Sequence, residues 1–145
     1  MLDLERDCCD LPLRTFDKDE IVIREGGRSG NLYFLVDGEV EISRDGVMLA
    51  RIHEPGAILG EVAVLLGRPH MADVRAVRAT TFRVAEDPES FLRDHPGVNL
   101  RIAQDLAKKV DAMSCYLVDL KRQYADESNH LGMVGEVLDS ILQHR

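Results

Sequence analysis

Short apolar runs alternate with polar turn signals over the first third of the chain. Each run is rich in β-branched or aromatic residues, a composition typical of strands. Asp37-Gly38 and Asp45-Gly46 are two-residue breaks of the kind that tight hairpins favour, so the pattern predicts a meander of antiparallel strands. The runs are LRTF (13–16), EIVIRE (20–25), NLYFLV (31–36), EVEISR (39–44) and VMLARIH (47–53).

The pattern changes after Pro55-Gly56. AILGEVAVLLG (57–67) is too short and too mixed for another long strand, so we expect residues 61–66, directly after Gly60, to form one or two helical turns. In residues 72–86 apolar and charged positions alternate again, which predicts further strands. A short helix is therefore inserted between the strands of a barrel.

Helical periodicity begins at Asp87-Pro88, a favourable N-cap and first-turn pair. We expect one short helix to Asp94 and a longer helix from about Gly97 to about Tyr124. In the longer helix apolar residues recur at alternating intervals of four and three, a seam that either dimerises or packs on the protein's own barrel. The seam consists of Leu106, Val110, Met113, Leu117, Leu120 and Tyr124.

The last segment, residues 130–144, has its apolar side chains on one helical face and predicts a short amphipathic helix. Residues 125–129 break the preceding pattern. We therefore divide the chain into a domain at 1–125 and a helical extension at 126–145.

Composition narrows the functional classes. The chain has 145 residues and a formal charge of −8, which argues against nucleic acid or an anionic membrane as the main partner. Its apolar runs fall short of the roughly 20 residues that a membrane span needs, and the acidic N-terminus does not resemble a signal peptide. We expect a cytoplasmic protein.

Catalytic and metal signatures do not stand out. The three cysteines show no CxxC spacing, and we expect free thiols. The five histidines show no HxH spacing, and neither a Ser-His-Asp nor a Cys-His arrangement is visible. We expect no enzyme activity, no bound metal and no cofactor.

Three segments and the terminal helices together resemble the cyclic-nucleotide-binding domain family. The segments are residues 25–46, PGAILGEVAVLLGRP (55–69), ADVRA (72–76) and the helices after residue 87, and the likeness spans nearly all of 10–125. The resemblance implies a mainly β fold with α: an eight-stranded antiparallel jelly-roll barrel, a short phosphate-cassette helix and C-terminal helices. It also implies a cyclic nucleotide as ligand.

Local chemistry agrees with a phosphate cassette. Gly60 permits close backbone approach, and the N–H groups from Glu61 onward, including those of Val62 and Ala63, have no acceptor within the helix because they lie at its start. The resemblance gives Glu61 the role of accepting a hydrogen bond from the ribose 2′-hydroxyl.

The chain departs from the family at two cassette positions. Family members usually have an arginine, which pairs with the cyclic phosphate, where this chain has His70. Imidazole lacks the permanent charge and planar fork of guanidinium, and the exchange is expected to cost about 1.5–3 kcal/mol of binding. Met71 replaces a small residue whose hydroxyl can engage guanine, so cyclic AMP is expected over cyclic GMP. Arg68 and Arg75 either compensate or are solvated surface charges.

On the long helix, Met113 and Ser114 fall where the family places base contacts, although a surface serine is the alternative for Ser114. These residues complete a predicted stand-alone sensor whose output passes through a homodimer at helix 97–124 or an unidentified protein partner. The alternative is a degenerate module that keeps the fold for protein–protein contact without binding a nucleotide. The residues after the long helix are too few and not basic enough for a DNA-binding helix-turn-helix.

Overall fold

The computed structural model describes residues 3–124 and 128–143. It divides into two compact units, residues 1–100 and 101–145, and each is described by itself. The boundary predicted at 125/126 lies outside the described residues and stays a prediction.

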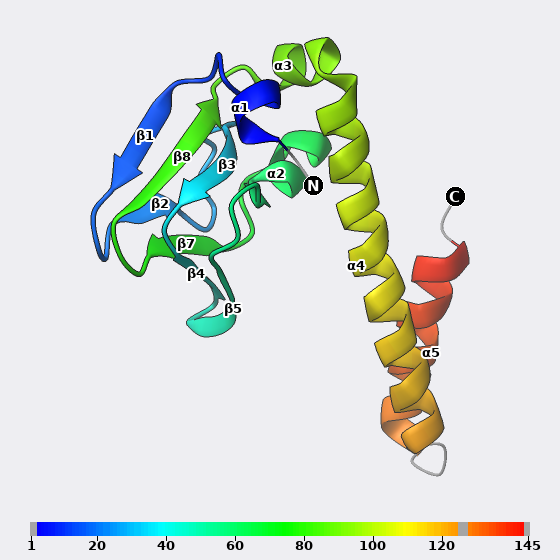
Figure 1. Ribbon diagram of the computed structural model, residues 1–145. Coiled ribbons are helices and arrows are strands. Elements are labelled where there is room, and N and C mark those ends of the chain that lie inside the picture. Colours follow the sequence, from blue (N-terminus) through cyan, green and yellow to red (C-terminus); the bar gives the residue numbers. More distant parts are fainter. Residues whose placement is uncertain (1–2, 125–127, 144–145) are drawn as a thin grey trace. The chain divides into compact units, whose positions relative to one another are not determined.

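The first unit is a jelly-roll sandwich of two antiparallel sheets, and its described residues contain eight strands (Figure 1). One sheet has the order β1-β8-β3-β6 and the other the order β2-β7-β4-β5. The strands are β1 (Leu13–Phe16), β2 (Ile21–Ile23), β3 (Leu32–Asp37), β4 (Val40–Arg44), β5 (Val47–Ile52), β6 (Ile58–Leu59), β7 (Asp73–Ala76) and β8 (Thr80–Ala85). The predicted jelly-roll class is confirmed.

The predicted meander is wrong except at one turn. β4 and β5 pair as a hairpin across Asp45-Gly46, but Asp37-Gly38 connects strands of different sheets. Thr80 Oγ1 holds this crossing by accepting from Glu39 N and donating to Glu39 O, both at 3.1 Å. The physical reason is burial, because strands sent to opposite sheets can cover one shared core with their apolar faces.

The core lies between the two sheets and is centred on Phe82. Its ring meets Phe16 and Tyr33 edge to face, with ring centroids 6.0 Å and 5.7 Å apart. The apolar alternation along β8 supplies Phe82 and Val84 to this core, and both are fully buried. This rigid sandwich positions the short segment between β6 and β7 that carries the cassette.

The predicted helices are present with small shifts at their ends. α2 (Glu61–Leu66) lies between β6 and β7, and α3 (Pro88–Asp94) starts at the N-cap Asp87, whose carboxylate accepts from Ser90 N. α4 spans Pro96–Gln123, and α5 spans Ser128–Gln143.

The second unit is a helical hairpin in which α5 returns beside α4 (Figure 1). A Cβ added at Gly135 would lie 3.7 Å from Lys121 Nζ, so the two helices are in contact there. Half of the predicted seam on α4 remains open: Val110, Met113 and Tyr124 are 49%, 56% and 42% exposed.

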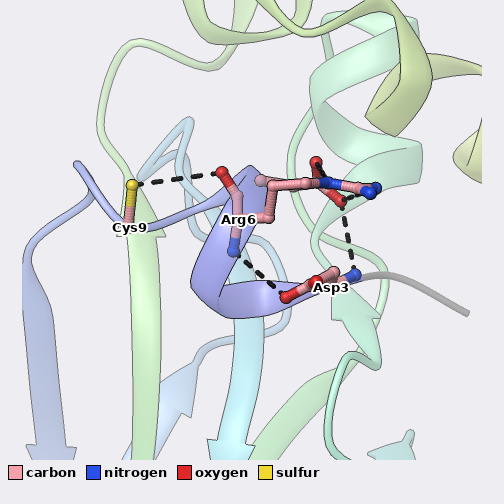
Figure 2. Close-up of polar contacts among 4 residues, drawn as sticks. Asp3, Arg6 and Cys9 are labelled. Atoms are coloured by element: carbon pink, nitrogen blue, oxygen red, sulfur yellow. Dashed lines mark hydrogen bonds and ion pairs between the residues drawn. The ribbon is translucent and has the colours of Figure 1, made fainter.

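A short N-terminal helix, α1 (Leu4–Asp7), was not predicted. Figure 2 shows how its polar groups close the turn: Arg6 N donates to Asp3 Oδ1 at 3.1 Å, and Cys9 Sγ lies 4.0 Å from Arg6 O. Cys8 follows the helix and is buried, which raises the pKa of its thiol to about 12. That thiol therefore stays protonated and packs as a small apolar side chain.

Candidate functional site

The candidate site begins where β6 runs into α2. β6 pairs with β3, with Leu59 opposite Tyr33, and this pairing sets the end of the strand beside the start of β3. Gly60 then takes a left-handed φ of 86° and caps α2 without a side-chain hydrogen bond. A Cβ at Gly60 would lie 2.8 Å from Asn31 O, so no larger residue fits without movement of the backbone. The structure therefore holds the first turn of α2 against the end of the barrel.

The first residues of α2 face partly inward. Ala63 is buried, whereas Glu61 and Val62 are half-buried. In an α-helix the first backbone N–H groups have no partner within the helix, and Val64 N is the first to bond back, to Gly60 O at 3.2 Å. Gly60 thus caps α2, and Glu61, Val62 and Ala63 form its first turn. Their predicted contact with a phosphate stays a prediction.

His70 is the buried polar residue next to this turn. Its side chain is only 6% exposed, and its Cε1 would lie 3.4 Å from a Cβ at Gly60. Its Nε2 is 3.0 Å from Ser29 Oγ. Burial lowers the pKa of His70, so the imidazole is neutral at physiological pH. The imidazole therefore supplies no charge beside Gly60.

His70 also ties down the loop between β2 and β3. The backbone N–H of His70 donates to Gly27 O at 2.9 Å, and the backbone carbonyl of His70 accepts from Gly26 N at 2.8 Å. Farther along the same segment, Asp73 Oδ1 accepts from Glu25 N at 2.7 Å. The cassette and this loop are therefore joined by both backbone and side-chain hydrogen bonds.

Sequence reasoning did not identify Ser29. It lies in GGRSG, a stretch whose glycines indicate only a turn, and it is 41 residues away from His70 in the chain. A hydroxyl in a turn carries no sign of its distant partner, so the pairing required the fold.

Met71 and Arg68 lie on the two sides of Pro69 in the chain. Met71 is half-buried, and its Sδ is 2.8 Å from Arg68 Nη2. Arg75, the other residue considered as a compensating cation, pairs with Asp19 and Glu41 in ion pairs of 2.6 Å and 3.6 Å. Arg75 thus has two carboxylate partners already, whereas Arg68 contacts a neutral thioether.

Met113 and Ser114 belong to the second unit, on α4. Met113 is exposed, while Ser114 Oγ is buried without a hydrogen-bond partner among the described residues. Their predicted contact with a base stays a prediction.

Residues 3–124 and 128–143 contain no group of three or more His, Cys, Asp or Glu side chains placed to hold a metal ion. Within the same ranges no helix combines the length and apolar character needed to cross a membrane.

Comparison with known proteins identifies the family that this geometry matches. The family model described as "Cyclic nucleotide-binding domain" matches residues 13–91, more than half of the chain. That range contains both sheets, α2 and the beginning of α3.

Individual proteins are similar to parts of this chain. Glutaminase 1 of Bradyrhizobium diazoefficiens is 35% identical over 66% of this chain and 16% of its own length. The cAMP-dependent protein kinase regulatory subunit of Debaryomyces hansenii is 31% identical over 46% of this chain and 15% of its own. The chain thus spans about one sixth of these relatives. The crystal structure of the Thermus thermophilus catabolite activator protein has the same fold, with a TM-score of 0.71, 23% identity, and coverage of 81% of this chain and 58% of that one.

Proposed function

Since this chain belongs to the cyclic nucleotide-binding domain family, we propose that it is a regulatory sensor of a cyclic nucleotide, without catalytic activity. The ligand enters the barrel, the N–H groups at the start of α2 receive its phosphate, and Glu61 accepts a hydrogen bond from the ribose 2′-hydroxyl. The signal passes to α4 and from there to a second copy or another protein in the cytoplasm.

One observation carries this proposal: the conformation of Gly60 in front of α2. Its left-handed φ and the 2.8 Å approach of Asn31 O to its missing Cβ position allow only glycine, and they leave the amides of the first turn oriented together. The half-burial of Glu61 at the same turn suits a carboxylate that grips a hydroxyl.

His70 sets the strength of binding in this proposal. A neutral imidazole that already bonds Ser29 offers the phosphate at most one further ring nitrogen. The missing charge-assisted pair corresponds to one to two decades of affinity, so we expect a weak sensor. Cyclic AMP is preferred over cyclic GMP because the thioether of Met71 cannot donate a hydrogen bond to guanine.

The signalling step is proposed from the surface of α4. Val110 and Met113 are largely exposed at seam positions, and such a stripe of apolar residues on a helix suits a partner helix. A ligand that binds one arrangement of α4 better than another shifts the population toward it and changes the partner interface.

The burial of His70 also favours a second candidate function. A histidine that is 6% exposed and bonded to Ser29 fills part of the space beside Gly60, as expected of a module that has kept the fold and lost the nucleotide. In that case the chain serves as a protein–protein interaction module.

Titration calorimetry of the full chain with cyclic AMP and cyclic GMP tests the two candidates. The sensor predicts measurable heat with cyclic AMP and about a tenfold loss of affinity in Glu61→Gln, as expected for one hydrogen bond to a charged acceptor. Glu54→Gln is the matched control, because Glu54 is an exposed carboxylate outside the cassette. Absence of heat and of competition with a fluorescent analogue at millimolar ligand would exclude the sensor and leave the interaction module as the candidate.

The pH dependence tests the contact of His70 with phosphate. Binding of an anion raises the pKa of His70 above the free-state value, which burial has lowered. The added affinity is fully present below the free-state pKa and is lost as the pH rises through the bound-state pKa. Equal affinities for cyclic AMP on both sides of that window, in a chain that still binds, would exclude the contact and leave the amides of α2 as the phosphate site.

A further inference from the structure

A pocket of about 340 Å³ lies beside α2, and neither Gly60 nor His70 is among the residues that line it. The loop between β2 and β3, the C-terminal half of α2 and the start of α3 form its walls, all within the first unit. We call it the α2–α3 pocket and define it by Arg28, Ala63, Val64, Arg68, Asp87 and Glu89. Its volume is at the lower end of the range typical of small-molecule sites.

The charged side chains of the α2–α3 pocket differ in whether they already have hydrogen-bond or ion-pair partners. Asp87 Oδ1 accepts from Ser90 N at 3.4 Å, and Glu89 pairs with Arg93 at 2.5 Å. The arginines have no such partners: among the described residues the Arg28 side chain makes no hydrogen bond or ion pair, and the Arg68 side chain contacts only the thioether of Met71. Two guanidinium groups without carboxylate partners in the described residues thus border one pocket of a chain whose net charge is −8.

Both arginines extend from backbone that is held in place. Arg28 lies between Gly27 and Ser29, and each of these bonds His70. Arg68 follows the capping residue Gly67, and its N–H donates to Ala63 O at 3.1 Å. Because the backbone on both sides is fastened, a ligand that bridges the two side chains orders little of the chain on binding.

The chemistry of the walls selects the ligand. Two guanidinium groups suit a phosphate, whose oxygens accept paired hydrogen bonds from each planar fork. Ala63, Val64 and Pro88 provide apolar surface for the carbon skeleton. The free lone pairs of Asp87 and Glu89 can accept hydrogen bonds from hydroxyls. We propose that the α2–α3 pocket binds a sugar phosphate through Arg28 and Arg68, neither of which belongs to the cassette, so that the proposal is independent of the proposed cyclic nucleotide function. The pocket shares only Ala63 with the cassette.

The test is a titration of the full chain with ribose 5-phosphate, followed by calorimetry and by the amide signals of an ¹⁵N-labelled sample. We expect shifts at Gly30 and Gly67, which line the pocket. Arg28→Gln and Arg68→Gln should each weaken binding about tenfold, as for loss of one charge-assisted hydrogen bond. Arg78→Gln is the matched control, since Arg78 is an exposed arginine outside the pocket, and it should leave the affinity unchanged.

Four outcomes would overturn the proposal. Unchanged affinity in both Arg28→Gln and Arg68→Gln would remove the arginines from the site. Equal affinity for inorganic phosphate and ribose 5-phosphate would reduce the pocket to a nonspecific anion site, and binding of ribose alone would remove the phosphate requirement. Shifts confined to Gly60 and Glu61 would place the ligand in the cassette. A parallel titration of Glu61→Gln separates the two sites, because this variant should lose cyclic AMP affinity and retain that for ribose 5-phosphate.

Discussion

The two ends of α2 have similar backbones and different surroundings. Gly60 precedes the helix with a φ of 86°, and Gly67 follows it with a φ of 62°. A Cβ at Gly60 would lie 2.8 Å from Asn31 O, whereas no described atom lies within 4 Å of a Cβ at Gly67. Glycine is therefore needed for conformation alone at the C-terminal end, and for both conformation and space at the N-terminal end.

The polar groups beside the two ends differ in the same way. The N-terminal end adjoins His70, which is buried, neutral and bonded to Ser29, while the C-terminal end leads into Arg68, which is exposed and charged. The N-terminal end is suited to close backbone contact, and the C-terminal end is suited to attracting a negative charge. One short helix thus presents two surfaces with different chemistry.

Replacing Gly60 should cause the largest loss of stability among these variants. Gly60→Ala adds the cost of a left-handed residue to the clash with Asn31 O, and we expect a loss of roughly 2–4 kcal/mol in the free energy of unfolding. Urea denaturation followed by circular dichroism measures it. A loss no larger than that of Gly67→Ala would mean that the chain relieves the clash by a small movement.

Gly67→Ala tests conformation without crowding. We expect a loss of about 1–2 kcal/mol in the free energy of unfolding, because only the left-handed φ is penalised. The same denaturation series gives the difference between the two glycine variants, which is the contribution of the close approach at Gly60. An increase in stability would show that the chain ends α2 differently when glycine is absent.

Ser29→Ala removes the side-chain bond that fixes His70. We expect a loss of about 1 kcal/mol in the free energy of unfolding, the usual net value of one hydrogen bond. Urea denaturation measures this loss as well, and Ser43→Ala, in the half-buried part of β4, serves as the comparison variant. Equal losses in both variants would assign the effect to general packing instead of the His70 contact.

The smallest expected effect is the pH dependence of stability. Burial lowers the folded-state pKa of His70, so its contribution is fully present above the unfolded-state value of about 6.5 and is lost as the pH falls through the folded-state pKa. Denaturation curves of the native chain and His70→Gln, measured across that window, should converge toward acid. A constant difference between the two proteins would contradict a neutral, buried His70.

Much of the architecture could be predicted from local patterns. The apolar run after Gly60 predicted α2 to the residue, and Asp87-Pro88 predicted the start of α3. The assignment of strands to sheets could not be read in this way, since Asp37-Gly38 has the composition of a hairpin turn and yet joins two sheets. Turn chemistry specifies a change of direction, whereas burial decides which strands become neighbours.

The features of the candidate site also fall into two groups, those that local sequence specifies and those that depend on the fold. By itself the sequence determined the helix start at Gly60 and placed a carboxylate at Glu61 and an imidazole at His70 close to it, because each depends on residue type and short spacing. Only the tertiary structure decided that His70 is buried, neutral and bonded to Ser29, and that Arg28 and Arg68 border one pocket. Burial and partnership arise when segments distant in the chain meet, and that meeting sets the protonation state of a histidine and the charge of a pocket.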